Sequence, residues 1–206
     1  MSRTEGDFDG DGATDVATVH YVLPEGGCVE DVFAQPLPYR VAVRFGSGAT
    51  LDVPTDACSR VCQGRVAVDL DRDGRDELAL LVDQGASTSF LSFLRVGTDG
   101  AAGIPVAPPG APGFEPGAPG VFPFGGSVVH FDFLTCAEER GEPRVVATSA
   151  VLAPDGSRYE VRDAVFRFDG SAFVPLRTEQ RTVPASEDGA PQAPLPLGPP
   201  CPGLGV

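Results

Sequence analysis

The chain has 206 residues, and its 15 Lys+Arg, all of them Arg, stand against 29 Asp+Glu, for a formal net charge of −14. This balance argues against nucleic-acid binding through phosphate neutralisation and against a basic patch that would hold the chain on anionic lipid. No apolar run of about 18 residues occurs, so we predict no transmembrane segment, while a hydrophobic content of 42% suffices for a core.

The first residues carry no apolar stretch after Arg3, so they do not resemble a signal peptide. Five Cys and a single Met nevertheless favour an oxidising compartment. We therefore expect an extracellular or cell-envelope protein, secreted or lipid-anchored, whose export signal is absent from this chain.

An acidic segment at residues 7–15, Asp-Phe-Asp-Gly-Asp-Gly-Ala-Thr-Asp, recurs at residues 69–77 as Asp-Leu-Asp-Arg-Asp-Gly-Arg-Asp-Glu. Each copy runs into a short apolar stretch, at 16–22 and at 78–82. Self-similarity at a fixed period is the signature of a repeat protein. A degraded third copy begins near Asp132, and we expect no metal there because non-carboxylate residues occupy its ligand positions: Leu134, Cys136 and Arg140.

Short strands separated by turn residues follow each acidic segment, and no segment shows a helical period. Predicted second strands are 39–45, 89–96 and 159–168, each followed by a Gly-containing turn at 46–48, 97–100 or 169–171. Third strands are predicted to begin at about Thr50, Gly103 and Ala172. Fourth strands are predicted at 66–70 and 128–133, and a further strand of the third unit at 144–151. The predicted fold is all-β, with about three four-stranded antiparallel repeat units.

Domain organisation follows from this pattern. We expect a β-repeat domain over 1–182, with units at about 7–68, 69–131 and 132–182 and a Gly/Pro-rich insertion at 97–126. Residues 183–206 form a Pro-rich tail that is expected to be extended or disordered.

The spacing of the acidic side chains points to a hard cation. Alternate carboxylates with Gly at the sixth position let a backbone wrap around Ca²⁺, which takes more oxygen ligands than Mg²⁺. We expect two Ca²⁺ sites, with carboxylates at positions 1, 3, 5 and 9 and a main-chain carbonyl at position 7. The candidate ligands are Asp7, Asp9, Asp11, Ala13 and Asp15 in the first loop, and Asp69, Asp71, Asp73, Arg75 and Glu77 in the second.

The acidic loops have two other interpretations. Asp and Gly also form ordinary turns without metal, although two copies at one spacing make this interpretation less favourable. An EF-hand requires Glu at position 12 and flanking helices, whereas this chain has Thr18 or Leu80 there and strand-like flanks.

The motif Asp-x-Asp-x-Asp-Gly-x-x-Asp/Glu before an apolar strand, repeated about every 60 residues, resembles the FG-GAP/VCBS repeats of integrin-like β-propellers. The resemblance implies that each repeat is a four-stranded blade with a calcium loop at its edge, and that the eight carboxylates among the candidate residues occupy the family's ligand positions. Three units are too few for a propeller of about four to eight blades. An open arc, a stack or a propeller completed by a partner or an oligomer is therefore expected. The Arg-only, Ala-rich composition is similar to that of exported actinobacterial repeat proteins.

The cysteines are odd in number: Cys28, Cys58, Cys62, Cys136 and Cys201. The closely spaced Cys58 and Cys62 fit a local bridge or halves of two longer ones, and a zinc site lacks a second Cys pair or a nearby His. Cys201 is placed to fasten the Pro-rich tail to the body.

No nucleophile elbow, phosphate-cradling loop or ordered catalytic set is recognisable, and His20 and His130 fit strand residues. The first hypothesis is therefore a non-catalytic, exported calcium-binding β-repeat module with a structural role or a role in binding an unidentified protein or carbohydrate. The alternative is a calcium-dependent hydrolase or an accessory domain of an enzyme acting on polysaccharide or phosphoesters. A cell-envelope adhesion module is a third hypothesis.

Overall fold

The computed structural model describes residues 1–23, 38–55, 57–58, 61–107, 118–196 and 198–202. These residues form strands, turns and loops and contain no helix, which confirms the predicted all-β class. All strand pairs are antiparallel, and they form one sheet of four strands and one of nine.

The first unit is a simple meander of four neighbouring strands. β1 (Ser2–Gly6), β2 (Asp15–Tyr21), β3 (Tyr39–Arg44) and β4 (Thr50–Thr55) lie side by side in chain order. Burial alternates along β2 and β3, because successive side chains of a strand point to opposite faces. β1 is polar and has no alternation of apolar residues that would predict a strand, yet it pairs with β2 along its whole length.

The second unit repeats this order. The strand predicted at 66–70 as the fourth of the first unit is instead the first strand of the second unit, because it pairs with the strand that follows the second acidic loop. β5 (Gln63–Val68), β6 (Glu77–Gln84), β7 (Thr88–Gly97) and β8 (Gly100–Gly103) again pair each with the next. Strand β8 ends at Gly103, where the sequence analysis expected its start, because Gly97 already pairs with Gly100 across a two-residue turn. In both units the acidic loop joins the first strand to the second.

The third unit has the longest strands: β10 (His130–Glu139), β11 (Glu142–Leu152), β12 (Arg158–Phe168) and β13 (Phe173–Pro184). An additional strand, β9 (Phe122–Ser127), pairs with both β7 and β10 and joins the second and third units into one sheet. The sheet stays open, since β5 and β13 are its two ends.

The predicted strand at 128–133 is wrong in its first two residues. Val128 and Val129 form the turn between β9 and β10 and are 82% and 52% exposed. Their β-branched side chains favour a strand, but Ser127 pairs directly with His130. The pairing of Ser127 with His130 leaves Val128 and Val129 in the turn, and this pairing outweighs their intrinsic strand preference.

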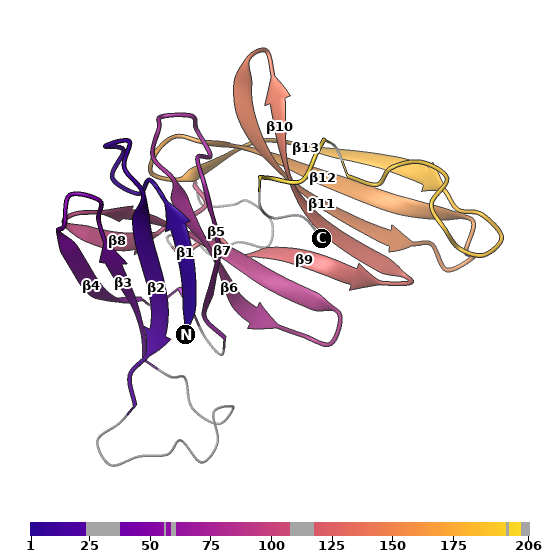
Figure 1. The fold of residues 1–206 in the computed structure, drawn as a ribbon. Coiled ribbons are helices and arrows are strands. Elements are labelled where there is room, and N and C mark those ends of the chain that lie inside the picture. The colour runs from indigo at the N-terminus through magenta and orange to yellow at the C-terminus, as the bar shows by residue number, and fades with distance from the viewer. Residues whose placement is uncertain (24–37, 56, 59–60, 108–117, 197, 203–206) are drawn as a thin grey trace.

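The three units pack as successive layers, with the second unit in the middle (Figure 1). Strand β6 is buried on both faces. Leu78 and Leu80 belong to a core shared with Val41 of the first unit, whereas Ala79 belongs to a core shared with Phe166 of the third. This burial explains the continuous apolar run of β6.

Two disulfides lie within the described residues. Cys58 is bonded to Cys62, so the local bridge is the correct alternative and these two sulfurs do not form a zinc site. Cys136 of β10 is bonded to Cys201, which confirms that this cysteine fastens the tail. Cys28 lies outside the described residues.

The described part of the tail lies on the third unit. Leu195 is buried in a small core with Tyr159, and the Tyr159 hydroxyl donates to the carbonyl of Gly189 at 2.7 Å. Together with the Cys136–Cys201 bond, these contacts fix the tail at several points.

Candidate metal centre

The two acidic loops follow the same backbone course. Residues 7–15 connect β1 to β2, and residues 69–77 connect β5 to β6. The fourth and sixth positions have positive φ in both loops: 77° and 82° at Gly10 and Gly12, and 63° and 87° at Arg72 and Gly74. Arg72 therefore adopts a left-handed conformation that glycine adopts more readily. The repeated pattern in sequence is thus a repeated local structure.

Carboxylates at the first and fifth positions shape each loop by accepting backbone hydrogen bonds. Asp7 accepts from the N–H groups of Gly10 and Gly12, both at 2.8 Å. Asp69 accepts from Gly74 at 3.0 Å in the second loop. The fifth-position residues act in the same way: Asp11 accepts from Ala13 N–H at 2.7 Å, and Asp73 from Arg75 N–H at 2.9 Å. Such short-range bonds explain why Asp is required at these spacings.

The ninth-position carboxylates are completely buried. Asp15 accepts from the N–H groups of Phe8 at 2.7 Å and Gly46 at 2.8 Å. Glu77 accepts from Leu70 N–H at 3.0 Å. Each of these side chains therefore ties the start of its loop to the strand that follows.

Three carboxylates converge in each loop. Ligand oxygens of Asp7, Asp9 and Asp15 all lie within 4.8 Å of one another, and the same holds for Asp69, Asp71 and Glu77. The fifth-position residues, Asp11 and Asp73, are not in these groups. The carbonyls of Ala13 and Arg75 stay predicted ligands. Positions 1, 3 and 9 of the predicted pattern are thus brought together in both loops.

Mutual repulsion is visible in the pKa values of the third-position residues. Loss of hydration raises the pKa of Asp9, and the neighbouring charges of Asp15, Asp11 and Asp7 raise it further, against a hydrogen bond from Asp11 N–H. Burial likewise raises the pKa of Asp71, helped by the charge of Asp73. A cation would relieve this repulsion.

Arg95 of β7, which the sequence analysis did not single out, reaches the second loop. Its Nη1 donates to Glu77 Oε1 at 2.8 Å and lies 3.7 Å from Asp71 Oδ2, and its Nη2 donates to Asp73. Burial raises the pKa of Glu77 to about 8, although the Leu70 N–H and Arg95 act in the opposite direction. For Asp73, burial is the largest single effect and raises the pKa, but the hydrogen bonds from Arg95 and the Arg75 N–H and the charges of both arginines together lower it below its usual value.

The two loops contact each other directly. Asp7 N–H donates to the Asp76 carboxylate at 2.8 Å, and Asp76 N–H donates to the Asp7 carbonyl at 2.7 Å. A Cβ at Gly10 would lie 2.6 Å from Arg75 Cγ, so the first loop needs glycine there for close approach as well as for its positive φ. The loops form one structural unit although they are far apart in sequence.

The third copy of the motif has a different structure. Asp132, Leu134 and Cys136 lie along the continuous strand β10, which turns into β11 at Arg140 and Gly141. Both turn residues have positive φ, as a tight two-residue hairpin requires. Asp132 is 2.7 Å from His130 Nε2. His20 and His130 lie in β2 and β10, which confirms them as strand residues.

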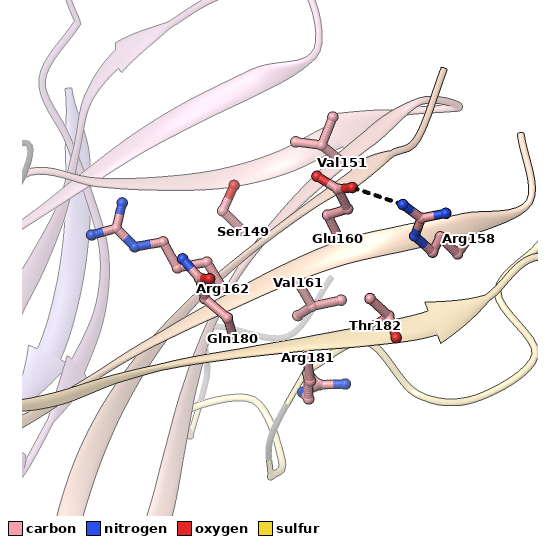
Figure 2. Close-up of a pocket in the computed structure, with 9 residues that line it drawn as sticks. All are labelled: Ser149, Val151, Arg158, Glu160, Val161, Arg162, Gln180, Arg181 and Thr182. Carbon is pink, nitrogen blue, oxygen red and sulfur yellow. Dashed lines mark hydrogen bonds and ion pairs between the residues drawn. The ribbon is translucent and has the colours of Figure 1, made fainter. Parts of the chain in front are cut away.

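A polar hollow of about 630 Å³ lies over β11, β12 and β13, away from the acidic loops (Figure 2). Arg162 lies between Ser149 and Gln180 in the cross-strand register, and Arg158 pairs with Glu160 at 3.3 Å. None of the ten predicted ligands lines this hollow.

Comparison of the chain with protein-family models, with curated proteins and with solved structures finds no match. Within the described ranges, no helix is long and apolar enough to cross a membrane.

Proposed function

We propose that this chain is a calcium-binding β-repeat module in which the metal stabilises the acidic loops. The observation that carries this proposal is the convergence of Asp7, Asp9 and Asp15 in the first loop. No ion pair within the described part of the chain neutralises these three carboxylates. A cluster of oxygens with no internal counter-charge fits a hard divalent cation.

The three carboxylates of the first loop would contribute to metal binding in different ways. Asp7 and Asp9 would supply oxygens from partly buried side chains, while Asp15 is completely buried and held in place by the N–H groups of Phe8 and Gly46. When bound, Ca²⁺ would supply positive charge that offsets their repulsion. Because Asp15 is already fixed, binding mainly orders the exposed half of the loop.

The FG-GAP/VCBS resemblance and an exported location belong to the same proposal. Two disulfides are compatible with an extracellular protein, where calcium modules bind at about 10⁻⁴ to 10⁻³ M. At such affinities the site is occupied in a calcium-rich medium, and the bound ion has a structural role. A protein or carbohydrate partner stays a prediction from the sequence.

Thermal unfolding with and without calcium tests the proposal. At 10 mM Ca²⁺ and the affinities above, mass action adds about 1.4 to 2.7 kcal/mol per site relative to EDTA. The melting temperature should rise by about 3 to 10 °C for a chain of this size.

Two variants test whether the calcium-dependent rise in melting temperature comes from the first loop. Asp9→Asn should abolish most of the rise, whereas Asp52→Asn, a control in the exposed Arg40 ion pair, should retain it. Mg²⁺ at the same concentration should stabilise less. Identical melting curves in EDTA and in calcium would remove the basis of the proposal.

A further inference from the structure

The second acidic loop already holds a positively charged group among its carboxylates. Arg95 lies 2.8 Å from Glu77 and 3.7 Å from Asp71, and these are two of the three residues whose oxygens converge there. It also pairs with Asp73. The guanidinium therefore lies beside two of the three carboxylates that a bound cation would use.

Phe45 occupies the equivalent position in the first unit. Val16 pairs with Arg44 in the first unit as Leu78 pairs with Leu94 in the second, so the next residue along is Phe45 in one and Arg95 in the other. Phe45 is 2% exposed and belongs to the core between the units. The first loop therefore receives no guanidinium from this position.

The surroundings of Arg95 hold its side chain in place. Its side chain is 20% exposed, and its guanidinium carbon lies 5.7 Å from the centre of the Phe168 ring. Glu77 is completely buried, so removal of Arg95 would leave its Oε1 without this hydrogen-bond donor. An arginine side chain in a protein is effectively always protonated. The positive charge of Arg95 therefore opposes binding of a metal cation at the second loop.

We infer that the two loops are not equivalent: the first is the calcium site, and in the second Arg95 serves as the resident cation. This inference rests on the proposed function of the first loop. Calcium enters the second loop only when the guanidinium leaves Glu77 and Asp71. The sequence-based expectation of two Ca²⁺ sites thereby becomes one site that binds calcium and one that is neutralised internally.

Equilibrium dialysis of the chelator-treated full chain against calcium measures how many ions bind and how tightly. The wild type should bind one ion, with any second ion at least about tenfold weaker because it must displace a positive charge. Asp9→Asn should remove the tight site, and Asp71→Asn should leave it intact. Arg95→Phe, which copies the first unit, should give two ions of similar affinity.

A second variant and a folding control accompany these measurements. Arg95→Gln removes the charge but keeps a polar side chain, and it should also increase calcium binding at the second loop. Each variant is checked in EDTA for its β circular dichroism and its unfolding transition. If Arg95→Phe fails to fold, Arg95→Gln carries the test alone.

The outcomes separate the two proposals. Two equally tight ions in the wild type, or equal losses in Asp9→Asn and Asp71→Asn, would overturn the inference and leave calcium binding in place. Unchanged binding in both Arg95 variants would overturn it as well. No calcium bound by the wild type or by either Arg95 variant would overturn both proposals.

Discussion

Fully buried carboxylates fix this β protein at points where separate segments meet. Asp15 and Glu77 accept backbone N–H groups from the start of their own loops. Asp163 instead accepts from the Thr148 hydroxyl at 2.6 Å and from Arg181 Nε at 2.9 Å. A carboxylate removed from water must be matched by donors in this way. The loops therefore keep much of their shape before any metal binds.

At this scale the sequence predicts local sites well and distant partners poorly. Asp7, Asp9 and Asp15 could be identified because their spacing within one loop determines their proximity. Arg95 could not, because it reaches the second loop from β7 through strand register. A cation on a neighbouring strand leaves no local signal in the motif that it neutralises.

Replacement of Asp163 by alanine is expected to destabilise the third unit by about 2 to 4 kcal/mol. The substitution removes both bonds and leaves the Arg181 guanidinium, which is partly buried and also donates to the Leu195 carbonyl, without its counter-charge. Urea unfolding measures the change. The matched control is Glu160→Ala in the same strand, whose exposed pair with Arg158 should contribute less than about 1 kcal/mol. Equal losses in the two variants would contradict the role given to burial.

Among the strands, alternation of apolar residues identified most of the three meanders, but β1 and β9 escaped it. β1 reads Ser-Arg-Thr-Glu-Gly and forms because β2 offers a paired edge. β9 reads Phe-Pro-Phe-Gly-Gly-Ser, and all of it except Ser127 lies inside the predicted Gly/Pro-rich insertion. Neither segment has an intrinsic strand preference, so tertiary pairing determines both.

Gly126 is the position in β9 where a side chain should be least tolerated. Its φ is 150°, and a Cβ there would lie 2.3 Å from the His130 carbonyl oxygen across the strand pair. We expect Gly126→Ala to cost more than about 2 kcal/mol, because backbone strain and a backbone clash add. The measurement is the free energy of unfolding in urea.

Gly141→Ala provides the matched control for this substitution. Gly141 also has a positive φ, 83°, but a Cβ there meets nothing within 4 Å. Its cost should be limited to the conformational penalty of about 1 kcal/mol. If both variants lose the same stability, close approach of β9 to β10 is not what requires glycine at Gly126.

For the molecule as a whole, the second unit is the layer on which the other two depend. Its two faces contribute to separate cores, and the core facing the third unit contains Phe93, Phe122, Phe166 and Phe173 in edge-to-face contacts. The sequence predicted repeats but left an open arc, a stack and a completed propeller as alternatives, since alternation gives the buried face of a strand and not the sheet that covers it. The third unit extends beyond this stack, where the tail packs on it (Figure 1).

The Cys136–Cys201 disulfide is expected to contribute more to stability than the Cys58–Cys62 disulfide. The first spans 65 residues and the second spans 4, and a longer closed loop removes more entropy from the unfolded chain. The chain-entropy relation gives about 4 kcal/mol for the long loop and about 2 kcal/mol for the short one. The bond also supports the folded tail, because Cys136 N–H donates to the Pro199 carbonyl at 3.1 Å.

Paired serine replacements distinguish these contributions. Cys136→Ser with Cys201→Ser should lower the free energy of unfolding by about twice as much as Cys58→Ser with Cys62→Ser. Urea titrations under non-reducing conditions, with EDTA present, separate this effect from calcium binding. An equal or larger loss from the short-loop pair would mean that the local bridge before β5, and not the fastening of the tail, is the more important covalent constraint.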